Sequence, residues 1–369
     1  MNDQAYMAQA LRLAKQGLYS AHPNPRVGCV LVAGQQVVGE GWHKRAGEPH
    51  AEVHALQQAG AQAQGATAYV TLEPCSHHGL TPPCAHALAQ AGVSRVVIAM
   101  QDPNPQVAGR GMAYLQAQGI QVDLLSGELA EAARTLNCGF VKRMEQGLPF
   151  VRLKLAMSLD GRTAMASGES QWITGPAARA DVQELRARSS AILTGADTVI
   201  TDNARLTVRA EQLPLSGELC ELALSRPPQR IVIDGRLRVP TDVAFFAAGP
   251  AWLATHQSPP ANTSAIEYLQ LPEVNGHIDL QALLVELAQR DINELMVEAG
   301  PQLAGAFMQA GLVDELYIYM AATLLGSSAQ PLMHLPIDYM ADAVRLQIVE
   351  MRALADDWRI IARPVLSNA

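Results

Sequence analysis

A histidine, a glutamate and two cysteines occur in an order that suits a hydrolytic metal centre. One alanine separates His50 from Glu52, and Cys75 and Cys84 each follow a proline. A catalytic zinc takes three protein ligands and leaves its fourth position to water. His50, Cys75 and Cys84 therefore predict one zinc ion per chain. Such a metal lowers the pKa of its water to about 7, so that hydroxide is available at neutral pH.

Glu52 is the residue that the spacing favours for proton transfer. It lies two residues after His50, where an expected helix begins, and its carboxylate can face the water without binding the metal. A deaminase needs this shuttle because an amine leaves poorly until it is protonated. His-x-Glu followed by Pro-Cys is the arrangement of zinc-dependent nucleobase deaminases. The motif predicts hydrolytic deamination with Glu52 as the catalytic residue.

The second part of this motif departs from its usual form. Two residues usually separate the cysteines, whereas eight residues separate Cys75 from Cys84 here. The three ligands still meet if the intervening loop folds back. The alternative is a closed structural zinc site, whose fourth ligand would come from His54, His77 or His78.

Three further residues are candidates for contact with the deaminase substrate. Asn24 can offer a donor and an acceptor to a pyrimidine edge, or it can belong to a plain turn. His77 could contact a substrate phosphate or be a solvated loop residue. His43 could contact the substrate or be a histidine with structural partners. We favour substrate contact for Asn24 and retain His77 as a second predicted substrate residue.

The second half of the chain carries a different set of candidates. It lacks a Gly-x-Gly-x-x-Gly sequence after a strand, so a Rossmann dinucleotide site is not predicted. Near Gly300 and Pro301 an apolar strand runs into the start of a helix. This helix start could bind a pyrophosphate, although Gly-Pro also simply begins helices. Arg186 and Arg209 could clamp a phosphate through paired N–H groups, or they could be ordinary solvated charges.

The elements that position these residues alternate between helices and strands. Apolar periodicity predicts helices over 4–17, 51–59, 85–91, 112–118, 177–188, 280–288 and 302–310. Apolar, β-branched runs predict strands over 27–32, 37–42, 68–72, 95–100, 121–125, 150–156, 191–194, 230–233, 294–298 and 315–320. This alternation indicates layered α/β sheets. The stretch 211–228 is rich in Pro, Leu and Ser, and we expect it to be a surface loop.

Length and local composition predict two domains. A chain of 369 residues exceeds the size at which a single core stops growing. The stretch 140–150 is polar and is interrupted by Gly147 and Pro149, which is typical of a domain boundary. We expect a deaminase domain over 1–146 and a second domain over 147–369.

The overall composition excludes several classes of function. Hydrophobic residues make up 49% and charged residues 17% of the chain, as in globular proteins. The net charge of −8 opposes a general affinity for nucleic acid or for an anionic membrane. The N-terminus has no apolar signal-peptide core, and the five cysteines suit thiols or metal ligands rather than a disulfide framework. We therefore expect a cytoplasmic protein that acts on small molecules.

Two other functions share parts of this pattern. A polynucleotide-editing zinc deaminase with an accessory domain would carry the same motif, but it would need a basic face, which the net charge opposes. A zinc-stabilised assembly protein with a degenerate second domain would need no catalytic residue. The intact set of ligands and Glu52 argues against it.

Several short motifs together resemble the bifunctional deaminase–reductases of riboflavin biosynthesis. They are His-Pro-Asn-Pro-x-Val-Gly-Cys at 22–29, Ala-Gly-Glu-Pro-His-Ala-Glu at 46–52, Thr-Leu-Glu-Pro-Cys-Ser-His-His-Gly at 71–79, Thr-Pro-Pro-Cys at 81–84, Asp-Pro-Asn-Pro-Gln-Val at 102–107, Ser-Leu-Asp-Gly-Arg-Thr-Ala at 158–164 and Val-Glu-Ala-Gly-Pro at 297–301. The resemblance spans nearly the whole chain. It implies a cytidine-deaminase-like α/β/α domain followed by a dihydrofolate-reductase-like α/β domain.

The resemblance also implies two successive reactions and their sites. The first is deamination of 2,5-diamino-6-(5-phosphoribosylamino)pyrimidin-4(3H)-one, and the second is NADPH-dependent reduction of the ribosyl chain to ribityl. It further implies a homo-oligomer, a dimer formed through the reductase domain. The family's cofactor positions fall on Ala156, Trp172, Thr198, Asp202, Gly300, Pro301, Gln302, Leu303, Ala304, Gly305 and Ala306. Its substrate positions fall on Ser170, Arg186, Leu206, Arg209 and Glu298. The family usually shows Asp-Asp-Pro-x-Leu where this chain has Asp-Asn-Ala-Arg-Leu at 202–206.

Overall fold

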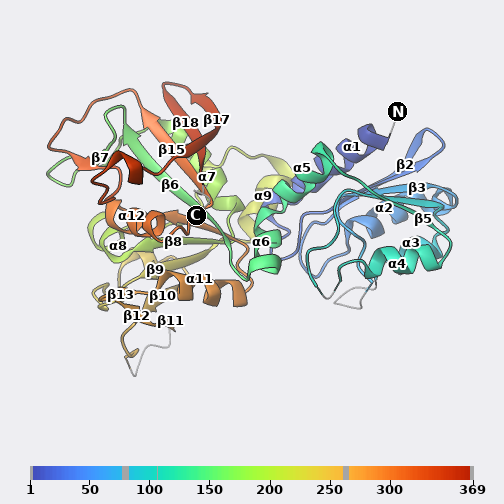
Figure 1. Cartoon of the computed structure of the whole chain (residues 1–369), viewed down its shortest axis with the longest axis horizontal. Helices are drawn as coiled ribbons and strands as arrows, with labels where there is room; N and C mark the ends of the chain where they lie inside the picture. The colour runs from blue at the N-terminus through green and yellow to red at the C-terminus, as the bar shows by residue number, and fades with distance from the viewer. Residues whose placement is uncertain (1–2, 77–82, 106, 261–265, 366–369) are drawn as a thin grey trace. The chain divides into compact units, whose positions relative to one another are not determined.

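The computed structural model describes residues 3–76, 83–105, 107–260 and 266–365 (Figure 1). The substrate candidate His77, together with His78, lies outside the described residues. Contacts within the chain divide it into two compact units, Met1–Leu148 and Pro149–Ala369. No helix among the described residues is long and apolar enough to cross a membrane.

The first unit is built on a five-stranded sheet. Its strands are β1 (Gly28–Ala33), β2 (Gln36–Trp42), β3 (Thr67–Val70), β4 (Arg95–Ile98) and β5 (Gln121–Leu124), in the order β2-β1-β3-β4-β5. β1 is antiparallel to β2 and β3, whereas β3, β4 and β5 are parallel. Side chains alternate across β1, so that Cys29 and Leu31 enter one core and Val30 and Val32 enter the other.

Helices cover both faces of this sheet and give three layers (Figure 1). The Cys29 face packs against α2 (Ala51–Ala59), α3 (Cys84–Gln90) and α4 (Arg110–Ala117). The Val30 face packs against α1 (Asp3–Gln16), α5 (Glu128–Leu136) and α6 (Cys138–Gln146). Helix α2 lies so close to β2 that there is no space for a side chain at Gly41. A Cβ there would come within 2.3 Å of the Ala51 carbonyl oxygen. This close approach fixes the first turn of α2, where the predicted deaminase residues lie.

The second unit is built on a nine-stranded sheet. Its strands are β6 (Phe150–Ser158), β8 (Ala191–Gly195), β9 (Gln229–Ile233), β10 (Ala251–Thr255), β11 (Glu267–Gln270), β14 (Glu294–Glu298), β15 (Glu315–Ala321), β17 (Leu346–Leu354) and β18 (Asp357–Pro364). The order is β11-β10-β9-β8-β14-β6-β15-β18-β17, and only the pairs involving β18 are antiparallel. The carboxyl ends of the parallel strands therefore share one edge, where α/β sheets bind ligands.

Helices and two small strand pairs complete the second unit. The helices are α7 (Pro176–Arg188), α8 (Ala196–Asp202), α9 (Gly217–Ser225), α10 (Ala244–Ala247), α11 (Leu280–Gln289) and α12 (Pro301–Gln309). The pairs are β7 (Arg162–Ala164) with β16 (Gln330–Pro331) and β12 (Glu273–Val274) with β13 (His277–Ile278). At the amino end of β6, the buried Arg152 forms ion pairs with Glu294 of β14 and Glu315 of β15. These pairs tie the three central strands together at the edge opposite the ligand edge.

One expectation about secondary structure needs correction. The expected loop over 211–228 contains helix α9, whose Leu222 and Ala223 are buried. The helical spacing of these apolar residues outweighs the flanking Pro and Ser. The polar stretch at 140–150 begins as helix α6, which buries Phe140 and Val141 and ends at Gly147 with a φ of 68°. Glycine ends a helix in this way because it adopts the left-handed conformation without strain.

Candidate active sites

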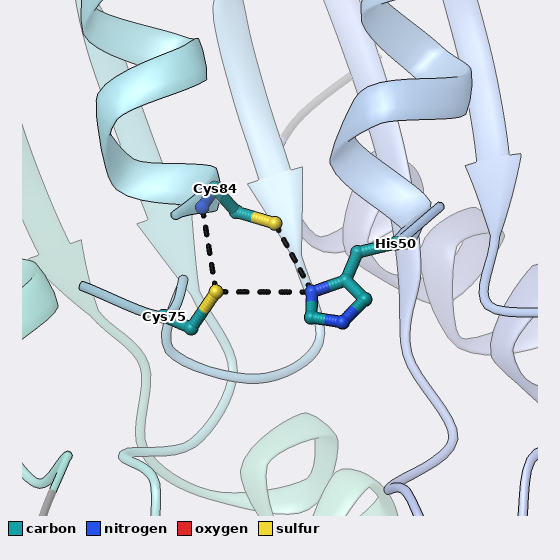
Figure 2. Close-up of side chains that lie close together, drawn as sticks. All are labelled: His50, Cys75 and Cys84. Atoms are coloured by element: carbon teal, nitrogen blue, oxygen red, sulfur yellow. Dashed lines mark hydrogen bonds between the residues drawn. The ribbon is translucent and has the colours of Figure 1, made fainter. Parts of the chain in front are cut away.

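The predicted zinc ligands meet where three segments of the first unit converge. His50 caps the start of α2, Cys84 is the first residue of α3, and Cys75 follows β3. Figure 2 shows the ring of His50 facing both cysteine side chains. His50 Nδ1 lies 3.2 Å from Cys84 Sγ and 3.7 Å from Cys75 Sγ. All three ligand atoms lie within 4.8 Å of one another. Zn–N and Zn–S bonds in a tetrahedral site place such atoms about 3.6–3.8 Å apart, so this donor set fits a zinc ion.

The surroundings of Cys75 favour its thiolate, which is the form of cysteine that binds metals. The Cys84 backbone N–H donates to Cys75 Sγ at 3.3 Å. The hydrogen bond from the Cys84 side chain holds the pKa of Cys75 well below its usual range, and burial opposes this shift. The same contact raises the pKa of Cys84. One thiolate is therefore stabilised by its surroundings, and a divalent cation would deprotonate the second thiol.

Glu52 lies in the first turn of α2, with its side chain buried beside the triad. It is 3% exposed, and burial raises the pKa of its carboxyl. Its Oε2 atom is buried and has no hydrogen-bond partner in the described part of the chain. Buried acceptors are nearly always paired, so this oxygen is placed to accept from a group other than the described residues, such as a water or a substrate.

A cavity of about 260 Å³ adjoins the triad. Besides His50, Glu52 and Cys75, its polar lining consists of Asn24, His43, Glu73, Asp102 and Asn104. The fourth ligand of the alternative structural zinc site is not found among the described residues, because no other His, Cys, Asp or Glu there joins the triad. His54 is thus not part of the group, while His77 and His78 lie outside the described residues.

His43 links the predicted substrate residue Asn24 to the protein. Burial lowers the pKa of His43 to about 4, so that the ring is neutral. Its Nδ1 lies 3.2 Å from the Pro49 carbonyl oxygen and carries the proton. Nε2 therefore accepts a hydrogen bond from Asn24 Nδ2 at 3.0 Å. This bond orients the amide of Asn24, and it gives His43 the structural partners that one of its two sequence interpretations expects.

Three lining residues were not among the sequence candidates. Glu73, Asp102 and Asn104 all belong to motifs that carry the family resemblance. The sequence signal was the pair of motifs Thr-Leu-Glu-Pro-Cys and Asp-Pro-Asn-Pro. Nothing in the sequence indicates that these motifs meet in space, which depends on β3 and β4 being parallel neighbours.

The second unit has a cavity of about 480 Å³ at the carboxyl ends of β6 and β14. The structure gathers ten predicted residues there, namely Ala156, Ser170, Trp172, Arg186, Thr198, Asp202, Arg209, Glu298, Gly300 and Pro301. Six predicted residues are not among its described lining, namely Leu206, Gln302, Leu303, Ala304, Gly305 and Ala306. Leu206 is 4% exposed and packs in the apolar core. Gly305 is also a packing residue, since a Cβ there would lie 2.0 Å from the His334 carbonyl oxygen.

Two predicted substrate residues, Arg186 and Glu298, bind each other. Arg186 Nε and Nη2 lie 3.0 and 2.9 Å from the two Glu298 oxygens, and Nη1 donates to the Thr207 carbonyl. Lys154, which the sequence did not indicate, lies 3.3 Å from Glu298 Oε1. Burial alone would raise the pKa of Glu298, but the charges of Arg186 and Lys154 hold it at about 2. Arg186 thus already has an anionic partner.

The remaining cations of this cavity have different surroundings. Arg209 is exposed, and its guanidinium forms no ion pair among the described residues. Its backbone N–H donates to the buried Gln183 Oε1 at 2.9 Å, which anchors the segment to α7. Arg179 lies over the ring of the exposed Trp172, 4.7 Å from its centroid, and donates to the Thr174 carbonyl at 2.8 Å. Arg209 is therefore the cation that is open to a ligand.

Helix α12 begins at this cavity as the sequence predicts. Gly300 is its extended N-terminal cap, Pro301 is its first residue, and no side chain caps it. The first N–H groups of a helix have no partner within the helix. Those of α12 begin with Gln302, because Pro301 has none, and such groups favour an anion.

Comparisons with known proteins agree with this division into two units. The cytidine and deoxycytidylate deaminase zinc-binding region matches residues 1–100, and the RibD C-terminal domain matches residues 149–360. The riboflavin biosynthesis protein RibD of Escherichia coli strain K12 is 54% identical over 361 residues, which cover 97% of this chain and 98% of that protein. A solved structure of Acinetobacter baumannii RibD has a TM-score of 0.91 at 46% identity and covers 99% of both chains. A Thermotoga maritima structure, named a diaminohydroxyphosphoribosylaminopyrimidine deaminase and 5-amino-6-(5-phosphoribosylamino)uracil reductase, has a TM-score of 0.86 at 31% identity, covering 98% of this chain and 99% of that one.

Proposed function

The chain belongs to the RibD family of riboflavin biosynthesis proteins, and from this premise we propose how its two cavities divide the chemistry. It is a bifunctional enzyme with a deaminase and a pyrimidine reductase activity. The predicted fold, a cytidine-deaminase-like domain followed by a dihydrofolate-reductase-like domain, is confirmed. A reductase domain has no place in the polynucleotide-editing alternative, which we set aside.

The name of the Thermotoga maritima relative gives two reactions, and we propose one of them for each cavity. We place the deamination of the diaminopyrimidine phosphate in the cavity beside His50, Cys75 and Cys84. We place the reduction of the ribosyl chain in the cavity beside Lys154 and Glu298. The domains would be 1–146 and 147–369, close to the two compact units.

The deaminase residues have separable roles in this proposal. A zinc ion held by His50, Cys75 and Cys84 would supply a water of lowered pKa as the nucleophile. Glu52 removes a proton from the attacking water and delivers it to the departing amine, so that a C–O bond forms, the C–N bond breaks and ammonia leaves. Its buried and unpartnered Oε2 supports this role. Asn24, oriented by His43, binds the edge of the pyrimidine.

The reductase residues divide between binding and proton transfer. A bound NADPH would supply a hydride for the sugar carbon attached to nitrogen, and the reduction would open the ring C–O bond at that carbon. Lys154 and Arg186 are both cations beside Glu298 in the cavity, and we assign to Lys154 the proton that the ring oxygen takes up. Arg209 binds the substrate phosphate. The start of α12 receives the cofactor pyrophosphate, and the exposed Trp172 offers an aromatic face to the cofactor.

We further propose a homo-oligomer that forms through the second unit. The edge strand β17 exposes a row of apolar side chains, Leu346, Ile348, Val349 and Met351. A long, apolar and exposed edge strand is a template for pairing with another chain. Sedimentation should give a multiple of the chain mass, and Ile348→Lys should shift the protein toward the monomer. A monomeric wild-type protein would refute this assignment. We also expect a cytoplasmic location, because metal binding needs the thiols of Cys75 and Cys84 to stay reduced.

The observation that carries this function is the zinc-compatible triad with Glu52 beside it, both lining one cavity. The test is to incubate the pure, zinc-loaded protein with the diaminopyrimidine phosphate and to identify the products by mass. Without NADPH we expect the deaminated product alone, with the ribosyl chain intact. With NADPH we expect the ribityl product. Unchanged substrate under both conditions would refute the proposed substrate.

A further inference from the structure

One fully hydrogen-bonded side chain of the deaminase cavity is a carboxylate that the proposed chemistry does not use. Glu73 is 3% exposed and lines the cavity. Its Oε1 accepts hydrogen bonds from the backbone N–H groups of Gly111 at 2.9 Å and Met112 at 3.2 Å. Its Oε2 accepts from those of Gly109 at 3.0 Å and Asp102 at 3.2 Å. Both oxygens are thus filled by peptide donors, and neither is left for a substrate.

These four donors belong to one segment of the chain. Gly109, Gly111 and Met112 lie at the start of helix α4, where N–H groups have no partner within the helix. Asp102 begins the segment that leads to this helix. The same segment supplies Asn104 and Val107 to the cavity. The Glu73 carboxylate therefore holds both ends of the segment that forms this wall.

Glu73 is also closely linked to the metal ligands. It lies two residues before Cys75, and its own N–H donates to the Met100 carbonyl at 3.0 Å. The contact is tight at Gly111, where a Cβ would lie 2.0 Å from the Pro74 carbonyl oxygen. The backbone at Pro74, next to the ligand Cys75, is therefore in close contact with the start of α4.

We propose that Glu73 is a positioning residue of the deaminase site, which sets the distance between the Cys75 ligand segment and the wall that carries Asn104. The inference rests on the proposed deaminase function of this cavity. The carboxylate acts through the backbone it binds, so it determines how the substrate is seated and not how the proton moves.

The test is Glu73→Gln in the full-length, zinc-loaded enzyme. The amide keeps the size of the side chain but turns one acceptor into a donor, which then faces two peptide N–H groups. We expect full zinc content, a KM for the diaminopyrimidine phosphate raised about 10-fold or more, and a kcat that falls less than KM rises. Reduction of the deaminated substrate by the same molecules should be unchanged. Glu128→Gln, which removes an exposed carboxylate from the first turn of α5, is the matched control and should match the wild type.

A second variant changes the contact between α4 and Pro74 while leaving the Glu73 side chain unchanged. Gly111→Ala inserts a Cβ between α4 and Pro74 and should raise KM in the same way. Wild-type KM in either variant would overturn the proposal. Zinc loss in step with activity would also overturn it, because Glu73 would then hold the ligands and not the wall. If the wild-type enzyme itself releases no ammonia from the substrate, the proposed function fails, and the positioning role fails with it.

Discussion

The guanidinium of Arg186 and the carboxylate of Glu298 form a two-pronged ion pair that joins helix α7 to the end of strand β14. The sequence suggested a different partner for the arginine, a substrate phosphate. In the structure both residues line the second cavity, and Lys154, which also lines it, forms an ion pair with Glu298. We therefore propose that Arg186 holds Glu298 in place and that Arg209 binds the substrate phosphate.

The charge on Glu298 makes the second unit sensitive to acid. Its pKa is about 2 against an ordinary 4.5, so the folded state favours the ionised form. The resulting stability is complete above pH 4.5 and is lost as the pH falls toward 2. The shift corresponds to about 3 kcal/mol. We expect Glu298→Gln to unfold more easily than the wild type near neutral pH, with a difference in unfolding free energy that shrinks as the pH is lowered. A difference that stays constant across this range would contradict the coupling.

Because we propose separate roles for Arg186 and Arg209, replacing each with alanine should affect a different property of the enzyme. Arg209→Ala should raise the substrate KM of reduction about 10-fold, corresponding to about 1.4 kcal/mol, and should leave the NADPH KM and the melting temperature near wild-type values. Arg186→Ala leaves the buried Glu298 without its main partner, which costs about 3–5 kcal/mol, so a lower melting temperature is expected. The two variants are compared by steady-state kinetics and thermal unfolding. Weaker NADPH binding in Arg209→Ala, with the substrate KM unchanged, would show that the phosphate role is wrong.

The zinc ligands can be tested independently of the second reaction. Cys75→Ser removes a thiolate that the site stabilises, and we expect loss of both zinc and deamination. Reduction of the deaminated substrate should survive, since the described residues that line its cavity include none of the zinc site. Metal analysis and NADPH oxidation measure the two effects on one sample. Full zinc content in this variant would rule out Cys75 as a ligand.

Proton transfer by Glu52 predicts a variant that binds metal but does not turn over. Glu52→Gln keeps the shape of the buried side chain but cannot accept a proton. Deamination should fall about 10²–10⁴-fold, the usual contribution of a positioned acid–base group, while zinc content stays full. Ammonia release and metal analysis provide the measurements. Turnover close to that of the wild type would mean that another group moves the proton.

The sequence predicted a site residue well only where that residue and its partners lie close together in the chain. His50 and Glu52 share one helical turn, so their spacing alone predicts that they cooperate. Glu73 could not be recognised in this way, because its four partners lie 29 to 39 residues further along the chain. The Arg186–Glu298 pair spans 112 residues. Composition also misled at 211–228, where an apolar helical face is hidden among Pro and Ser.

The two halves should be separable into independent catalysts. Each unit has its own sheet, its own buried cores and its own cavity. The chain passes between them through a short stretch, from the end of α6 at Gln146 to the start of β6 at Phe150. A fragment that begins at Leu148 keeps the whole nine-stranded sheet and its buried Arg152 network. We expect it to fold and to reduce the deaminated substrate with NADPH, with a substrate KM close to that of the full chain.

This fragment should need no metal, because the described cluster of metal-binding residues, His50, Cys75 and Cys84, lies in the first unit. A chelator should therefore abolish deamination by the full chain and leave reduction by both proteins unchanged. Mixing the fragment with the zinc-loaded first unit should restore the two-step conversion if the units work separately. An insoluble or unfolded fragment would mean that the second unit needs the first for stability. Reduction lost on chelation would mean that the two sites depend on each other.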